Sequence, residues 1–332
     1  MANARTLIVQ ALPGIGDMVW HLRHIHAIAA AAPGGRVDLL AKPRSQADRL
    51  LLADPAVARV LWLRRGPGEH DGLRGLLRLA ALLRPERYET AWILHGSWRY
   101  ALAARLAGIG TRIGYGRGLQ RCFLTRPGLR APARHHAIEN ADRLLDAGVL
   151  AFTEPEPRLP VSPQAAAAVE ARYGALPRPW VALGFGGSEP FKHWGRESFA
   201  ALAAALSVPG RRSLFLLGGP EQADEGAWIA ERVRAAGGEV EFALDLPLEQ
   251  AVALTAACRL YLGNDTGLLN VAAAVGVDAV GLFGGSPPLA YSPRIHPLVP
   301  PEGKTGMVAI GLAQVLDAAR RFGLEPRANG SS

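Results

Sequence analysis

The chain has 332 residues, of which 49% are hydrophobic, and its net charge is +8. This length exceeds one typical domain and this apolar content can fill more than one core, so two domains are expected. Its two cysteines have no Cys or His partner at metal-ligand spacing, which argues against a disulfide framework and a structural zinc site. Because it has neither a cleavable leader pattern nor a run of about 18 apolar residues, a soluble cytoplasmic protein is expected.

Short apolar runs alternate with helical patterns through the first half of the chain. The patterns predict strands at 6–12, 37–41, 57–63 and 90–94, and helices at 17–32, 46–53, 73–84 and 98–108. Pro13 and Gly14 mark the turn after the first strand. Repeated strand–helix units predict a parallel sheet with helices on both faces.

A proline-rich segment separates this half from a second set of alternating elements. Residues 152–163 contain four prolines and are predicted to form a stiff linker. A helix at 164–173 is followed by predicted strands at 180–186, 211–219, 240–244, 259–263 and 279–284, with helices at 198–206, 221–236, 248–257 and 268–276. The sequence therefore predicts two successive α/β domains.

The charge is divided unevenly between the two halves. Residues 1–150 contain 22 Lys/Arg and 11 Asp/Glu, whereas residues 151–332 contain 15 and 18, so the halves carry +11 and −3. An anionic partner of the first half is one interpretation, and a solvated basic surface without a partner is the other. The tryptophans are not interleaved with basic residues, so no nucleic-acid partner is predicted.

Ligands of such sheets bind beyond the carboxyl ends of the strands, so the loops that follow strands are the candidate sites. In the first loop, Gly14 and Gly16 let the backbone approach a ligand, and Asp17 lies near the start of the next helix. Val19 occupies the place of the third glycine of a dinucleotide fingerprint, which excludes that motif. Asp17 could also serve only as a helix cap.

Two loops of the second half carry groups that suit a nucleotide. Gly186 and Gly187 expose backbone N–H groups, and Ser188 and Lys192 add a hydroxyl and a positive charge, which together suggest a phosphate site. The Walker A pattern is absent, and a glycine turn beside a surface lysine is the alternative. After the next strand, Glu221 could accept hydrogen bonds from ribose hydroxyls or only favour the start of a helix.

The stretch GNDTGLLNVAAAVG, residues 263–276, places an acid, a hydroxyl and a glycine between a buried strand and a helix. Gly263 permits close approach, Asp265 and Thr266 are expected to cap the helix, and Gly267 leaves the first helical turn unshielded. Backbone N–H groups and the helix dipole would stabilise a diphosphate there. An ordinary N-cap made by Thr266 alone is the alternative.

Three of these segments resemble the motif regions of a known family. GIGDMV, GGSEPFKHWGRESFAAL and GNDTGLLNVAAAVGVDAVGLFG occur in the order seen in glycosyltransferase family 9, the ADP-heptose:lipopolysaccharide heptosyltransferases. The resemblance implies the GT-B architecture, two Rossmann-like parallel-sheet α/β domains facing a central cleft. It implies an acceptor-binding domain at 1–151, a nucleotide-sugar-binding domain at 164–305, and a helix at 306–322 that crosses back to the first domain.

The activity that this resemblance implies is inverting transfer of a sugar, a heptose from ADP-heptose, to a lipopolysaccharide-core or related glycan, without a metal ion or other cofactor. By motif, Asp17 would be the general base and Lys192 would neutralise the departing diphosphate. The donor would be bound by residues of the strand-following loops, namely Gly16, Gly187, Ser188, Glu221, Asp265, Thr266 and Gly267. The implied partners are the nucleotide-diphospho-sugar and an anionic glycolipid acceptor, with peripheral contact at the inner face of the cytoplasmic membrane.

The chain departs from the family pattern at three positions. Asn270 stands where family members commonly have His, Gly195 stands where a Pro follows the Trp, and Arg23 lies near the usual Pro of the first helix. We expect Asn270 and Arg23 to line the site and to change the specificity for donor sugar or acceptor.

Other functions remain compatible with the same residues. A nucleotide-sugar epimerase or hydrolase would turn over the donor without an acceptor, and a non-catalytic sugar- or lipid-binding protein would tolerate the loss of Asp17. A metal site at His21 and His24 lacks an apparent third ligand. An NAD-dependent oxidoreductase is disfavoured by the failed fingerprint.

Overall fold

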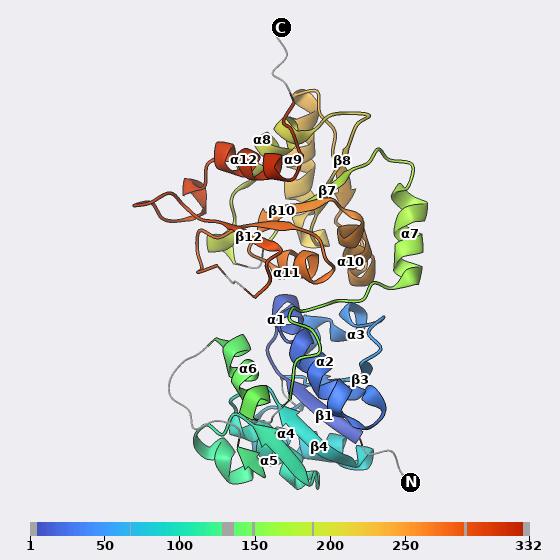
Figure 1. Ribbon diagram of the computed structural model, residues 1–332, viewed down its shortest axis with the longest axis vertical. Helices are drawn as coiled ribbons and strands as arrows, with labels where there is room; N and C mark the ends of the chain where they lie inside the picture. The colour runs from blue at the N-terminus through green and yellow to red at the C-terminus, as the bar shows by residue number, and fades with distance from the viewer. Residues whose placement is uncertain are drawn as a thin grey trace. The chain divides into compact units, whose positions relative to one another are not determined.

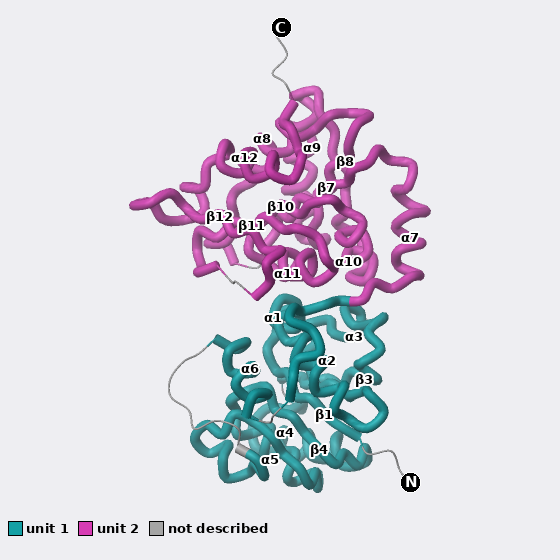
Figure 2. Tube along the Cα trace, viewed as in Figure 1, with its two compact units in different colours: residues 1–159 teal, residues 160–332 magenta. Residues whose placement is uncertain are grey.

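The computed structural model describes residues 5–66, 68–127, 136–147, 150–187, 189–288 and 291–327. The chain divides into two compact units, residues 1–159 and residues 160–332 (Figure 2). This division falls inside the proline-rich segment 152–163. Each unit is built on a six-stranded parallel sheet with helices packed on it, so the predicted fold class of two Rossmann-like α/β domains is confirmed.

The sheet of the first unit has the strand order β3-β2-β1-β4-β5-β6, and all neighbouring strands are parallel (Figure 1). Its strands are β1 (Arg5–Gln10), β2 (Val37–Ala41), β3 (Val57–Trp62), β4 (Tyr88–Ile93), β5 (Thr111–Gly114) and β6 (Arg126–Pro127). Its helices are α1 (Ile15–Trp20), α2 (Leu22–Ala31), α3 (Ala47–Leu50), α4 (Gly72–Leu83), α5 (Trp98–Leu106) and α6 (Ala137–Ala147), with short 3-10 helices η1 (Pro33–Gly35), η2 (Pro43–Ser45), η3 (Arg84–Glu86) and η4 (Gly118–Phe123). Buried side chains of α4 and α5 pack with Leu7 and Val9 of β1 in one apolar core.

The second unit repeats this topology. Its order, β12-β11-β10-β7-β8-β9, is the same doubly wound pattern, again with parallel neighbours. Its strands are β7 (Trp180–Gly184), β8 (Ser213–Leu217), β9 (Glu241–Ala243), β10 (Leu260–Asn264), β11 (Ala279–Leu282) and β12 (Ile295–Leu298). Its helices are α7 (Pro163–Tyr173), α8 (Arg196–Leu206), α9 (Ala223–Ala235), α10 (Leu248–Ala257), α11 (Gly267–Ala274) and α12 (Leu312–Arg321), with η5 (Pro190–Lys192), η6 (Pro220–Gln222) and η7 (Met307–Ala309). One apolar core joins the sheet to α8, α9 and α12, and the other joins it to α7, α10 and α11.

In each sheet the order of strands reverses between two neighbours, β1 and β4 in the first unit and β7 and β10 in the second. Doubly wound sheets bind ligands outside the carboxyl ends of the strands at this switch point. The loops that follow β1, β7 and β10 contain most of the predicted site residues. The topology of each unit therefore places these residues where a ligand is expected.

Several elements differ from the sequence prediction. The helix expected from Asp17 to Ala32 begins at Ile15 and is broken at His21, where the backbone N–H bonds to Met18 O in a tighter turn. The prediction missed β5, β6, β12 and α6. The three strands are four residues long or shorter, which leaves too few positions for a recognisable alternation.

The helix predicted at 306–322 is present in the second unit as α12 (Leu312–Arg321). Val315, Ala318 and Ala319 of α12 are buried in a core of the second unit, and α12 packs against α8. The apolar side chains of this helix thus pack within the second unit. Its crossing back to the first domain stays a prediction.

Among the residues that the structure describes, no helix combines the length and the apolar character needed to span a lipid bilayer.

Candidate active site

A buried asparagine at the end of β10 organises the switch point of the second unit. Asn264 is fully buried, and its amide nitrogen donates to the carbonyls of Phe185 (2.6 Å) and Gly186 (3.1 Å) in the loop after β7. Its amide oxygen accepts from the backbone N–H of Trp194 (3.2 Å). One side chain therefore fixes both the loop after β7, which we call the glycine loop, and the segment that carries Lys192.

Replacing Asn264 with Ala leaves three buried backbone groups without their partner. We expect the free energy of unfolding to fall by about 2–4 kcal/mol, because these buried groups lose their hydrogen-bond partner. Denaturant unfolding measures this change. Asn264→Asp keeps the acceptor for Trp194 N–H but cannot donate to the two carbonyls, so it should also be destabilised. An unchanged free energy of unfolding in both variants would contradict this role.

The strands at the switch point approach so closely that side chains are excluded. A Cβ on Gly184 would lie 1.8 Å from the hydroxyl of Tyr261, and a Cβ on Gly263 would lie 2.5 Å from the carbonyl oxygen of Gly184. Tyr261 is itself fully buried beneath these glycines. Glycine is therefore required for packing near the carboxyl ends of β7 and β10.

Lys192 and Asp265 form the charged centre of this site. Lys192 Nζ lies 3.1 Å from Asp265 Oδ2 and 3.2 Å from Glu189 Oε2. Ser286, in the loop after β11, donates to the same Asp265 Oδ2 at 2.6 Å. Burial lowers the pKa of Lys192, but the two carboxylates more than offset burial, so its pKa is raised and the ammonium stays charged at neutral pH.

The predicted capping of α11 by Asp265 is wrong, because its carboxylate is engaged by Lys192 and Ser286 instead. Thr266 occupies the N-cap position in an extended conformation, but its side chain makes no capping hydrogen bond. Asn270 is buried and donates to the Thr266 carbonyl at 2.8 Å, while it accepts from the Tyr291 hydroxyl. The first turn of α11 therefore keeps backbone N–H groups that a side-chain cap would otherwise use.

Contacts around the glycine loop bring further predicted residues together. A Cβ on Gly187 would lie 3.0 Å from His193 Nε2 and 3.8 Å from Thr266 Cγ2, and a Cβ on Gly186 would lie 3.0 Å from the Gln222 side chain. Gln222 donates to the carboxylate of its exposed neighbour Glu221 at 3.0 Å. Glu221 thus directly precedes the residue, Gln222, whose side chain lies beside Gly186 of the glycine loop.

Of the second-unit predictions, Gly187, Lys192, Asp265, Thr266 and Gly267 therefore surround one position, with Glu221 at its margin. The predicted Ser188 lies outside the described residues. An anion at this position would meet a lysine and a helix N-terminus together.

In the first unit, Asp17 lies in the first turn of α1, not at its N-cap, which is Gly14. Its carboxylate accepts the Gly14 N–H at 2.7 Å, and its carbonyl accepts from Gln10 at 3.1 Å and lies 2.8 Å from Nδ1 of the buried His21. Gly16, beside it, is buried. The backbone of Asp17 is thus fixed from two sides while its carboxylate stays partly exposed.

The surroundings of Asp17 raise the pKa of its carboxyl group. Burial raises its pKa, and the Gly14 N–H together with the charges of Lys42, Arg44 and His136 offsets only part of this effect. A raised pKa gives a better proton acceptor than an ordinary surface Asp.

Arg23 and the nearby histidines form a network inside the first unit. The Arg23 guanidinium contacts Asp142, donates to the Pro155 carbonyl at 3.2 Å and lies over the Phe152 ring. His24 lies 2.8 Å from the same Asp142 carboxylate, and burial lowers the pKa of His21 to about 3. These contacts tie α2 to α6 and to residues 152–155. The described residues contain no group of three or more His, Cys, Asp or Glu that could hold a metal ion.

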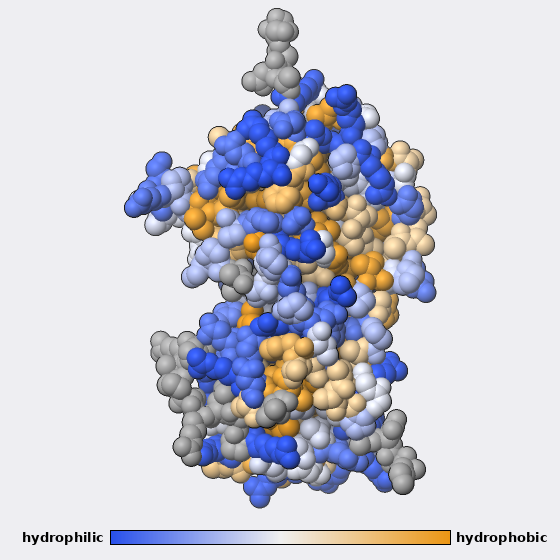
Figure 3. Space-filling view, in the orientation of Figure 1, coloured by the Kyte–Doolittle hydropathy of each residue, from blue (hydrophilic) through white to orange (hydrophobic). Residues whose placement is uncertain are grey.

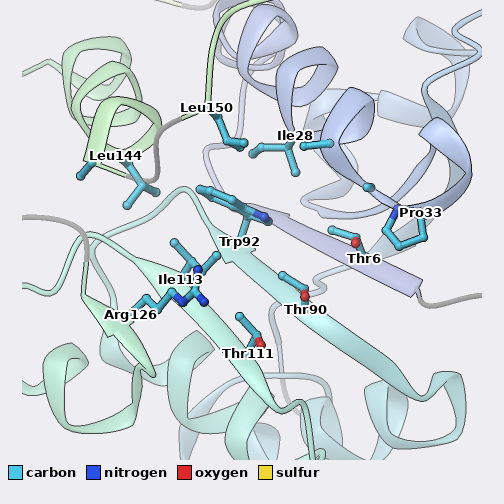
Figure 4. Close-up of a pocket in the computed structure, with 13 residues that line it drawn as sticks. Thr6, Ile28, Pro33, Thr90, Trp92, Thr111, Ile113, Arg126, Leu144 and Leu150 are labelled. Carbon is cyan, nitrogen blue, oxygen red and sulfur yellow. The ribbon is translucent and has the colours of Figure 1, made fainter.

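A separate cavity of about 540 Å³ lies between α2 and α6 over the sheet of the first unit (Figure 4). Hydrophobic residues also gather between these helices on the face shown in Figure 3. Thr6, Thr90, Trp92, Ile28 and Leu144 are among its lining residues. No predicted site residue lines it, and its threonines come from the first halves of their strands, away from the carboxyl ends where the candidate site lies.

Sequence reasoning missed three residues that build the second-unit site, Asn264, Gln222 and Ser286. Asn264 directly precedes Asp265 at the end of a strand, and Ser286 follows the strand that ends in LFG, so their position in strand-following loops was the available signal. Their partners lie 21 to 79 residues away in sequence for Asn264 and Ser286, which no local pattern reveals.

The chain is similar to known proteins in sequence and in fold. The family model described as glycosyltransferase family 9 (heptosyltransferase) matches residues 76–299. The "Lipopolysaccharide heptosyltransferase 2" of Salmonella typhimurium is 29% identical over 313 residues, which cover 86% of each chain. Among solved structures, a glycosyl transferase family 9 protein of Veillonella parvula has a TM-score of 0.81 at 20% identity, covering 97% of this chain and 98% of that one. The E. coli ADP-heptose lps heptosyltransferase II has a TM-score of 0.75 at 23% identity, covering 96% and 98%.

Proposed function

The chain belongs to glycosyltransferase family 9 and is a glycosyltransferase of GT-B fold, and from this premise we propose that it transfers a heptose from ADP-heptose to a lipopolysaccharide-core acceptor. The names of its relatives support the donor and the acceptor. The single observation that carries the proposal is the cluster of Lys192, Asp265 and Ser286 beside the first turn of α11, at the switch point of the second unit. A cation and free helical N–H groups at one point suit a diphosphate.

In this proposal the second unit binds the donor. The N–H groups of Thr266 and Gly267 and the ammonium of Lys192 would hold the diphosphate, and Glu221 would bind the ribose. Asp265 contacts Lys192 and Ser286 through the same oxygen, Oδ2. Its second oxygen, Oδ1, would accept a hydrogen bond from a hydroxyl of the sugar.

The first unit would supply the general base. The acceptor hydroxyl oxygen attacks the anomeric carbon of the heptose while the bond from that carbon to the diphosphate oxygen breaks, so one displacement inverts the configuration. Asp17 takes the proton of the hydroxyl, and ADP leaves with the bonding electron pair. Lys192 stabilises the negative charge that grows on the diphosphate as it leaves. The reaction as proposed uses no metal ion and no other cofactor.

The acidity of Asp17 gives this mechanism a definite pH dependence. A general base acts only when it is deprotonated, so kcat/KM should fall as the pH falls through the pKa of Asp17. Burial raises that pKa from the ordinary 3.8, so the acidic limb should lie above this value. Lys42→Ala removes a charge that lowers the pKa and should move the limb further upward. A pH–rate profile of both proteins measures the shift, and an identical limb in both would contradict the assignment.

A thermal-shift series with nucleotide diphosphates and their sugar conjugates tests the donor class. At a ligand concentration of about 100 times its Kd, the stabilisation is about 2.7 kcal/mol, so ADP and ADP-heptose should raise the melting temperature by several degrees. A shift only with UDP, GDP or dTDP compounds would reject the heptose donor. Consumption of ADP-heptose without any acceptor would instead indicate a hydrolase or epimerase.

We also propose that the acceptor is met at the inner face of the cytoplasmic membrane through peripheral contact. Support comes from the charge of the first half, +11 for residues 1–150, and from the anionic nature of a lipopolysaccharide-core acceptor.

Arg23 and Asn270 are proposed to affect the specificity for donor sugar or acceptor. Because both side chains are held by neighbours within their own units, they would act by positioning α2 and the Thr266 turn.

A further inference from the structure

Exposed leucines and arginines are concentrated on one side of the first unit. Half of the large hydrophobic side chains that are exposed among the described residues lie on α4, α5 and η4. Leu73 and Leu77, one turn apart on α4, are 74% and 60% exposed, and Leu119 of η4 is 61% exposed. We call the following set the leucine–arginine surface: Leu73, Leu77, Leu82, Leu106 and Leu119 with Arg74, Arg78, Arg84, Arg105 and Arg121.

The three elements that carry this surface adjoin one another. α5 packs against both α4 and η4, and Figure 1 shows α4 and α5 side by side. Arg84, at the end of α4, donates to the carbonyl of Leu106 at the end of α5 at 2.9 Å. α4 buries Leu76, Leu79 and Leu83 in the core, so Leu73 and Leu77 are not needed for folding the unit.

The charge of this surface has one sign. No Asp or Glu occurs between residues 72 and 85 or between residues 90 and 138. Two acids that flank α4 are paired with arginines, Asp71 with Arg65 at 3.1 Å and Glu86 with Arg5 at 2.7 Å. A third, Glu69, lies beside Arg78, which donates to its backbone carbonyl. The arginines of the surface therefore face solvent with little opposing charge.

We propose that the leucine–arginine surface docks the protein onto an anionic phospholipid bilayer. Leucines on an exposed helix enter the boundary between headgroups and acyl chains, and arginines beside them pair with lipid phosphates. A second copy of the chain is disfavoured as the partner. In a two-fold dimer this positively charged surface would face its own copy, and like charges repel. The proposal rests on the proposed function only in taking a membrane glycolipid as the acceptor.

The test is flotation of the full chain with vesicles of phosphatidylcholine alone and with vesicles in which about one third of the lipid is phosphatidylglycerol. We expect binding to the anionic vesicles only, and its loss as salt rises from about 0.05 M to about 0.5 M. The double variants L73S/L77S and R74Q/R78Q should each bind about tenfold more weakly. Val308→Ser, at a site that is 90% exposed, and R211Q/R234Q are the matched controls in the second unit and should bind like the wild type.

Melting curves and ADP titration of the same variants separate docking from folding and from chemistry. Both double variants should keep the wild-type melting temperature and ADP affinity. The membrane-docking proposal can therefore be rejected while the proposed reaction is retained, and the proposed reaction can be rejected while docking is retained. Equal binding to neutral and anionic vesicles, or unchanged binding by both double variants, would overturn the proposal. So would a concentration-dependent dimer that L73S/L77S dissociates, because the surface would then belong to a second copy.

Discussion

Replacing Asp17 with Asn is expected to lower the rate of heptosyl transfer by about two to four orders of magnitude, the usual contribution of a general base. The amide oxygen of Asn can still accept the Gly14 N–H that Asp17 accepts at 2.7 Å, so α1 should begin as before. The amide cannot take a proton from the acceptor hydroxyl. The loss should therefore appear in kcat, while the Kd for ADP, measured by calorimetry, stays unchanged because ADP binding is assigned to the second unit.

The matched control for Asp17→Asn is Asp48→Asn, which removes an exposed carboxylate from α3 of the same unit. That variant should transfer heptose at the wild-type rate. If Asp17→Asn retained most of its activity, Asp17 would be only a first-turn residue that accepts the Gly14 N–H.

Replacing Lys192 with Ala should have the second large effect. Lys192 would meet the diphosphate in the ground state and more strongly as it leaves, so we expect kcat to fall by about two to three orders of magnitude, as for the loss of one preorganised charge-stabilising donor. The affinity for ADP should fall as well. Steady-state kinetics and calorimetric titration with ADP give the two quantities.

The removal of Lys192 also leaves Asp265 without its cation, and the Asp265 side chain is only 10% exposed. The stability of the variant must therefore be measured beside its activity. Lys304→Ala is the control, because Lys304 is an exposed lysine of the same unit. A Lys192→Ala protein that is folded, binds ADP like the wild type and transfers heptose normally would contradict the proposed donor site.

The sequence predicted the parts of this molecule whose signal is local. Long apolar runs alternating with amphipathic helices were enough to predict two α/β units, and glycines with polar residues after strands indicated the loops around Lys192 and Asp265. The break at His21 was not predictable in this way. It depends on contacts of a buried histidine with the backbone of Asp17 and with the side chain of Gln10, 11 residues earlier.

The sequence patterns named the candidate residues but not the contacts between them. Asp265 looked like a helix cap because acids are common at that position, yet a lysine 73 residues earlier and a serine 21 residues later engage it. Likewise, the sequence singled out Arg23 but gave no sign that Asp142, on a helix that the sequence analysis missed, contacts its guanidinium. Such pairings depend on which elements become neighbours in the folded unit, and single-sequence patterns do not contain that information.

Mass spectrometry of truncated lipopolysaccharide-core acceptors, incubated with the wild-type protein and ADP-heptose, tests the proposed function most directly. We predict that one of the acceptors gains the mass of one heptosyl residue, with release of ADP, and that Asp17→Asn slows this gain by about two to four orders of magnitude. Transfer only from a different nucleotide sugar, or breakdown of ADP-heptose with no gain of mass by any acceptor, would contradict the assignment of this protein as a heptosyltransferase.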